Sequence, residues 1–81
     1  MKLFKAEHCP HCPAAEKNLK EAVKELKLNE TLELVNISED KGRIEALNNM
    51  IMSTPTLLFN GEIIRSETLL NKQELMKKLG R

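Results

Sequence analysis

The stretch that decides the fold is residues 7–17, EHCPHCPAAEK, in which two cysteines and two histidines fall within five consecutive positions. The cysteines are Cys9 and Cys12, and His8 and His11 are interleaved with them. Side chains of these types can hold a metal ion, form a structural disulfide, or act as a thiol pair that is oxidised and reduced in turn. The rest of the chain discriminates among these three hypotheses.

Length and composition limit the classes of protein to which the chain can belong. Its 81 residues predict one small domain, residues 1–81, that buries only about 60% of the surface its unfolded chain exposes. The net charge is +1 and the charged residues are mixed in sign, so no basic surface for nucleic acid is expected. Phe4 and Phe59 are the only aromatic residues, which removes the stacking platforms of a single-strand binder and predicts an aliphatic core.

The beginning of the chain predicts a cytoplasmic location without a membrane partner. Lys5 stands where the apolar region of a secretory signal would start, and no apolar run approaches the length of a membrane span. The cytoplasm keeps thiols reduced, so a C-x-x-C motif there is expected to be catalytic or metal-binding in preference to structural.

The apolar periodicity predicts seven elements in the order β-α-β-α-β-β-α. They are a strand within residues 2–7, a helix over 10–27, a strand over 31–37, a helix over 40–49, two strands within 56–65, and a helix between Asn71 and Gly80. A strand, a crossover helix, a second strand and a hairpin imply an α/β fold, with a mixed four-stranded sheet flanked by three helices.

Local signals at the ends of these elements make further predictions. Asn60-Gly61 accepts the positive φ angles of a type I′ hairpin turn. Asn71 as N-cap and Glu74 three residues later resemble a capping box, and Gly80 is expected to end the last helix in a left-handed conformation.

The strand over residues 31–37 has apolar side chains at alternating and adjacent positions. This pattern predicts that the strand is buried on both faces, as is typical of parallel pairing inside a sheet. The apolar positions are Leu32, Leu34, Val35 and Ile37.

The cysteine motif predicts a reactive thiol if Cys9 is the N-cap of the first helix. Pro10 would then take the first helical position, where its missing N–H costs nothing. The amides of the next two residues would point at the Cys9 sulfur, and the helix dipole would favour its thiolate. His11 and His8 could add positive charge, so Cys9 is expected to attack and Cys12 to resolve.

Pro13 modifies this prediction. Its missing N–H removes the first intrahelical hydrogen bond to the Cys9 carbonyl, so a loosened first turn is expected.

The structural and metal-binding hypotheses fit the sequence less well. A disulfide between residues three apart closes a very short loop, and such a bridge stabilises a fold poorly. Zinc needs four tetrahedral ligands, but no Cys or His follows Cys12, so no dedicated metal site is expected. A metal-binding or metal-delivery module that uses Cys9, Cys12, His8 and His11 stays open as the alternative.

Two motifs in this order resemble the thioredoxin/glutaredoxin superfamily: CPHC at residues 9–12 and MSTPTLLFNGE at residues 52–62. The resemblance covers essentially the whole chain and implies the thioredoxin fold. It also implies that the Thr54–Pro55 bond is cis, that the backbone of Thr54 pairs with a bound substrate, and that Met50, Ile51 and Met52 lead into this loop as docking or core residues.

The activity that this resemblance implies is thiol–disulfide oxidoreduction of the thioredoxin type. No cofactor beyond the redox-active disulfide Cys9–Cys12 is implied. The partners would be disulfide-containing protein substrates and an upstream thiol or flavoprotein reductase.

The chain departs from the best-known subfamilies in four places. Pro-His between the cysteines matches the periplasmic disulfide-forming oxidases, whereas the length matches glutaredoxin. Residues 65–71, RSETLLN, lack the glycine-rich turn that binds glutathione, although a glutathione-dependent glutaredoxin stays a second alternative. His8 replaces the tryptophan usual before the motif. Leu3 replaces the acid that thioredoxin places six residues before its first cysteine, so water or Glu7 is expected to handle the Cys12 proton.

Overall fold

The computed structural model describes residues 1–80 and contains four strands and four helices. Their bounds are β1 Lys2–Lys5, α1 Cys12–Glu25, β2 Glu33–Asn36, α2 Asp40–Asn48, β3 Thr56–Phe59, β4 Glu62–Ile64, α3 Ser66–Leu69 and α4 Lys72–Leu79. The predicted order is confirmed, with one correction: α3 is an additional helix, so four helices and not three flank the sheet. A single turn of four residues is too short to produce a periodicity in the sequence.

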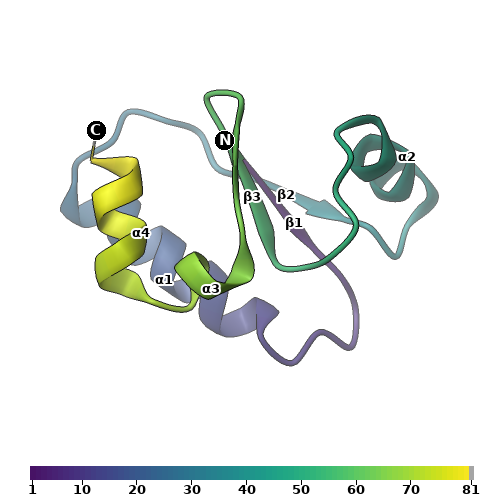
Figure 1. Ribbon diagram of the computed structural model, residues 1–81, viewed down its shortest axis with the longest axis horizontal. Helices are drawn as coiled ribbons and strands as arrows, with labels where there is room; N and C mark the ends of the chain where they lie inside the picture. Colours follow the sequence, from purple (N-terminus) through teal and green to yellow (C-terminus); the bar gives the residue numbers. More distant parts are fainter. Residues whose placement is uncertain (81) are drawn as a thin grey trace.

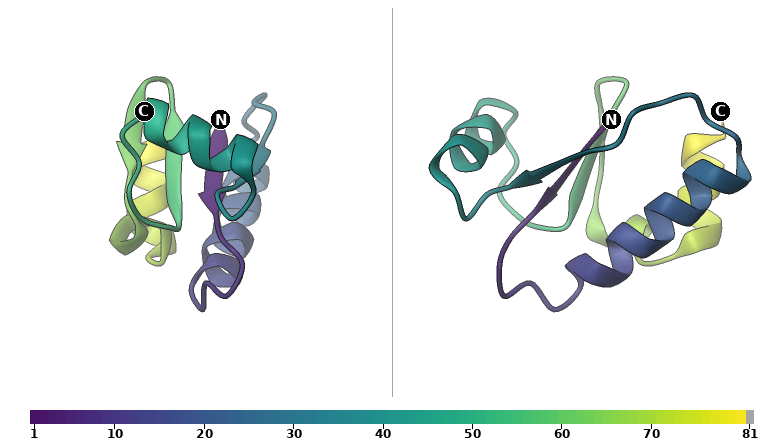
Figure 2. Two further views of the ribbon diagram at one scale, coloured as in Figure 1. Left: turned by 90° about the vertical axis from the view of Figure 1, so that its right-hand side faces the viewer. Right: turned by 180° about the vertical axis from the view of Figure 1, so that it is seen from behind.

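The strands form one mixed sheet in the order β2-β1-β3-β4. β1 pairs with β2 in parallel and with β3 antiparallel, and β4 pairs antiparallel with β3. Helices α1, α3 and α4 lie on one side of the sheet and α2 lies on the other, as Figure 1 and the turned views of Figure 2 show. This arrangement is the thioredoxin fold that the two motifs imply.

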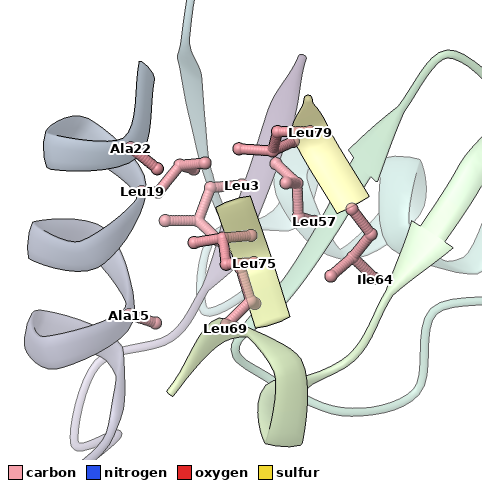
Figure 3. Packing of buried hydrophobic residues seen from close by; sticks show 9 residues of the cluster. All are labelled: Leu3, Ala15, Leu19, Ala22, Leu57, Ile64, Leu69, Leu75 and Leu79. Carbon is pink, nitrogen blue, oxygen red and sulfur yellow. The ribbon is translucent and has the colours of Figure 1, made fainter. Parts of the chain in front are cut away.

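Two apolar clusters, one on each face of the sheet, hold the layers together. The larger cluster joins the sheet to α1, α3 and α4 (Figure 3), and it consists of Leu3, Ala15, Leu19, Ala22, Leu57, Ile64, Leu69, Leu75 and Leu79. The smaller cluster, under α2, consists of Phe4, Val35, Ala46 and Ile51. Because side chains alternate along a strand, the adjacent residues Leu3 and Phe4 enter opposite clusters.

The hairpin and the N-terminal end of α4 agree with the sequence signals. Asn60 and Gly61 have φ angles of 51° and 79°, as a type I′ turn requires. The Asn71 side chain accepts a hydrogen bond from the Glu74 amide at 3.3 Å. Helix α4 ends at Gly80 as predicted, but the predicted left-handed conformation is wrong, because Gly80 has a φ of −81°.

The prediction that the second strand is buried on both faces is also wrong. β2 is an edge strand, so one of its faces is left partly open, and Leu34 is 40% exposed while Val35 is 6% exposed. Among the described residues, 1–80, no helix combines the length and the apolar character needed to span a membrane.

Candidate active site

Helix α1 begins at Cys12, with His11 as its N-cap residue. The prediction that Cys9 is the N-cap and Pro10 the first helical residue is therefore wrong. His11 has φ −97° and ψ −10°, and no side chain caps the helix. The proline in the first turn is Pro13, whose missing N–H cannot donate to the Cys9 carbonyl. That carbonyl accepts instead from the Cys12 amide at 3.3 Å, so residues 9–12 form a turn that leads into the helix.

Cys9 and Cys12 form a disulfide across this turn, with their Cα atoms 5.4 Å apart. The two residues differ in exposure: Cys12 is 5% exposed and faces the core, whereas Cys9 is half-buried. Because Cys12 is the first residue of α1, the bonded sulfur of Cys9 also lies at the N-terminal end of that helix. His8, Pro10 and His11 are exposed around it.

The segment Thr54–Pro55 leaves the sheet at the same edge as the cysteine motif. Thr56 at the start of β3 pairs with Phe4 near the end of β1, so the residues before Thr56 and those after Lys5 extend from neighbouring strands in the same direction. The Thr54–Pro55 bond is cis, as the resemblance implies. Pro55 is buried and Thr54 is half-buried, and both lie at the end of the sheet from which the cysteine motif extends.

The loop before this bond contains two exposed apolar side chains and one core residue. Met50 and Met52 are 83% and 84% exposed, whereas Ile51 is 5% exposed and belongs to the smaller apolar cluster. Ile44 and Leu47 on α2 are also exposed apolar side chains, each at 59%. The expectation of a docking surface thus fits the two methionines, and the expectation of a core contact fits Ile51.

An open cavity of about 870 Å³ lies on the β1 side of α1. Both cysteines line it, together with Lys5 and the α1 side chains Glu16 and Lys20. The Glu16 carboxylate pairs with the Nζ atoms of Lys20 at 2.8 Å and Lys5 at 3.8 Å. The hydrogen bond from Lys20 is the main cause that lowers the pKa of Glu16, so the carboxylate stays ionised at neutral pH.

Sequence reasoning missed Glu16. The available signal was its spacing, because Glu16 lies four residues after Cys12 and four residues before Lys20 on one helix. Glu7, the residue expected to handle the Cys12 proton, is exposed and does not line the cavity.

The arrangement gives no support to the metal-binding alternative. Among residues 1–80, no three His, Cys, Asp or Glu side chains gather closely enough to hold a metal ion. Cys9 and Cys12 are bonded to each other, and Cys12 is buried whereas both histidines are exposed.

A cysteine pair at a strand-to-helix junction, at the same end of a mixed sheet as a cis-proline loop, is typical of the thiol–disulfide oxidoreductases. Comparison with known proteins agrees, since the thioredoxin domain family matches residues 1–80. A thioredoxin of Methanocaldococcus jannaschii is 33% identical over 63 residues, covering 78% of this chain and 72% of that protein. No solved structure gives a significant match. The chain therefore belongs to the thioredoxin domain family.

Proposed function

We propose that the protein is a thioredoxin-type enzyme that exchanges disulfides with protein substrates, with Cys9 as the attacking and Cys12 as the resolving cysteine. The observation that carries the proposal is the unequal exposure of the two bonded cysteines at the start of α1. A substrate sulfur can reach the half-buried Cys9, whereas Cys12, at 5% exposure, can reach only a disulfide formed at Cys9.

The reaction consists of two successive thiol–disulfide exchanges. The Cys9 thiolate attacks one sulfur of the substrate disulfide, and the second substrate sulfur leaves as a thiolate and takes a proton. Cys12 then loses its proton, and its thiolate attacks the Cys9 sulfur. The mixed disulfide breaks and the first substrate sulfur leaves and is protonated. The substrate gains two electrons and two protons; the protein supplies both electrons and the Cys12 proton, the second proton comes from water because Cys9 starts as a thiolate, and the protein ends with the Cys9–Cys12 disulfide.

The position of Cys9 favours its thiolate. Its sulfur lies at the N-terminal end of the 14-residue helix α1, where unpaired amides and the helix dipole stabilise negative charge. His8 and His11, exposed on either side of Cys9, add positive charge when protonated. Pro10 restricts the turn that holds the two sulfurs together. These three residues are expected to tune the stability of the thiolate.

The loop before β3 provides the binding surface for the substrate. The backbone of Thr54 would pair with an extended substrate segment beside Pro55, and the exposed Met50 and Met52 would contact its apolar side chains. The redox-active disulfide would be the only cofactor. An upstream thiol or flavoprotein reductase would return electrons to it in a cytoplasmic setting.

Paired serine variants test the roles of the two cysteines. Cys9→Ser is expected to abolish the reduction of insulin disulfides, and Cys12→Ser is expected to accumulate a mixed disulfide at Cys9. Gel electrophoresis without reductant and mass spectrometry measure that adduct, and wild-type protein alkylated at both cysteines is the control. Full activity in Cys9→Ser, or an adduct that forms at Cys12 instead, would refute the assignment.

A further inference from the structure

One wall of the cavity beside the cysteines carries three charged side chains that form two ion pairs. Lys5 at the end of β1 and Lys20 on α1 both pair with the Glu16 carboxylate, which lies between them with a side chain only 23% exposed. The two ion pairs come from different elements, so the carboxylate is held between the sheet and the helix.

Glu16 lies on the same face of α1 as Cys12. Residues four apart on a helix are neighbours, with about 5–6 Å between their Cβ atoms. Both side chains line the same cavity. Glu16 is the acidic side chain that α1 places one turn from the resolving cysteine.

We propose that Glu16 keeps the Cys12 thiol protonated in the reduced protein, against the opposing positive charges of Lys5 and Lys20 on the same wall. This inference rests on the proposed function, in which Cys12 must not compete with Cys9 for the substrate. A carboxylate one turn away makes the Cys12 thiolate unfavourable, whereas the helix end favours the Cys9 thiolate. The charge of Glu16 thereby makes the resolving thiol ionise less readily than the attacking thiol.

The other charges around the cavity do not replace that of Glu16. They are Lys5 from β1, His8 from the preceding loop, and Lys17, Lys20 and Glu21 from α1. The second acid, Glu21, pairs with Lys72 of α4 at 3.3 Å and lies nine residues beyond Cys12, more than twice as far along the helix as Glu16. Removal of the Glu16 charge would leave both of its lysines unpaired beside the cysteines, and the thiolate of Cys12 would become more favourable.

The first test measures the ionisation of Cys12 alone. In a Cys9→Ser background, thiolate absorbance at 240 nm is titrated with and without Glu16→Gln. A unit charge about 6 Å away in a partly solvated site changes an ionisation constant about threefold to tenfold, so Glu16→Gln is expected to raise that of Cys12 by this factor. Lys20→Met, which removes a positive charge from the same wall, is expected to lower it.

Glu25→Gln is the matched control. It removes the same charge from the same helix, from a carboxylate that pairs with Lys72, but it lies 13 residues beyond Cys12, or about 20 Å along the axis. The ionisation constant of Cys12 should not change in this variant. An unchanged constant in Glu16→Gln, or a shift of the same sign in Lys20→Met, would overturn the proposal.

A second measurement follows the resolving step in a protein that retains both cysteines. Cys9 is coupled to thionitrobenzoate, and its release by Cys12 at neutral pH is followed at 412 nm. Glu16→Gln should speed the release and Lys20→Met should slow it, while equal rates in all variants would contradict the proposal. The titration needs no substrate, so its outcome is independent of the mixed-disulfide test in Cys12→Ser, whose failure alone would refute the proposed function.

Discussion

Ile51 donates its backbone N–H to the carbonyl oxygen of Ala46 at 2.8 Å, and this bond joins the end of α2 to the loop that reaches Pro55. Met50, between them, adopts a positive φ of 58°, which lets the chain reverse at the end of the helix. Ile51 is thereby anchored in the smaller apolar cluster while the methionines on either side of it are exposed. The candidate docking surface is thus preformed by a buried anchor.

Replacement of the two methionines should weaken substrate docking without unfolding the protein. The double variant Met50→Gln, Met52→Gln is expected to lower kcat/KM for a protein disulfide such as insulin several-fold, because apolar contact area is lost. Stability should change by less than about 0.5 kcal/mol for each exposed site. Activity toward a small aromatic disulfide, which is too short to reach the loop, serves as the control and should be retained.

Ile51→Ala separates the anchor from the docking residues. It leaves a cavity in the smaller cluster and should lower the free energy of unfolding by about 2–4 kcal/mol, as measured by urea denaturation. Insulin reduction equal to wild type in the double methionine variant would show that the loop does not bind the substrate.

Gly42→Ala should destabilise the protein although the residue lies in a helix. Gly42 is buried in the first turn of α2, and a Cβ atom there would overlap the backbone carbonyl of Asn36 at the end of β2. The added Cβ atom is fixed directly to the helix backbone, and the Asn36 carbonyl is itself part of the backbone, so neither can turn aside. Helix α2 would therefore have to move away from the sheet, at a cost of about 1–3 kcal/mol. Lys41→Ala, one residue earlier and exposed, is the control and should be close to neutral in urea denaturation.

The features that could be predicted from sequence are those set by neighbouring residues. The turn at Asn60-Gly61 and the cap at Asn71 depend on local backbone chemistry, and both are confirmed. The exposure of Leu34 depends on the order of strands in the sheet, which a single strand does not contain. Glycine weakens a helix, and the close packing of α2 on the end of β2 explains why Gly42 is present in α2.

The candidate site also combines features that the sequence predicts with features that only the fold shows. Cys9 and Cys12 stand out by spacing, and the cis bond at Pro55 followed from the resemblance. The predicted start of α1 was wrong because Pro13 cannot donate the first helical hydrogen bond to the Cys9 carbonyl. This loss outweighed the preference of Pro10 for the first helical position. Glu16 was missed because its ion pair with Lys5, a residue of β1, exists only once the chain has folded.

The start of α1 predicts a lowered pKa for the Cys9 thiol. Alkylation of Cys9 in the Cys12→Ser variant, followed against pH, should therefore have its midpoint below about 8.5, the ordinary value for cysteine. His11→Ala should raise the midpoint, because it removes a group that can be positively charged beside the thiolate. A midpoint at or above the ordinary value would show that neither the helix end nor the histidines stabilise this thiolate.

Glu16→Gln should also change how the stability of the protein depends on pH. The hydrogen bond from Lys20 is the main cause of the lowered pKa of Glu16, so the ionised carboxylate stabilises the folded state. That contribution is complete above the unfolded pKa, near 4.3, and is lost as the pH falls through the lower folded value. At pH 7 the variant should therefore be less stable than wild type by about 0.5–1 kcal/mol in urea denaturation, and the difference should shrink as the pH falls through the lowered folded pKa. Glu7→Gln, at an exposed position, should show no such pH dependence. A stability difference that stays constant from pH 7 to pH 2 would mean that the side chain acts through packing and not through its charge.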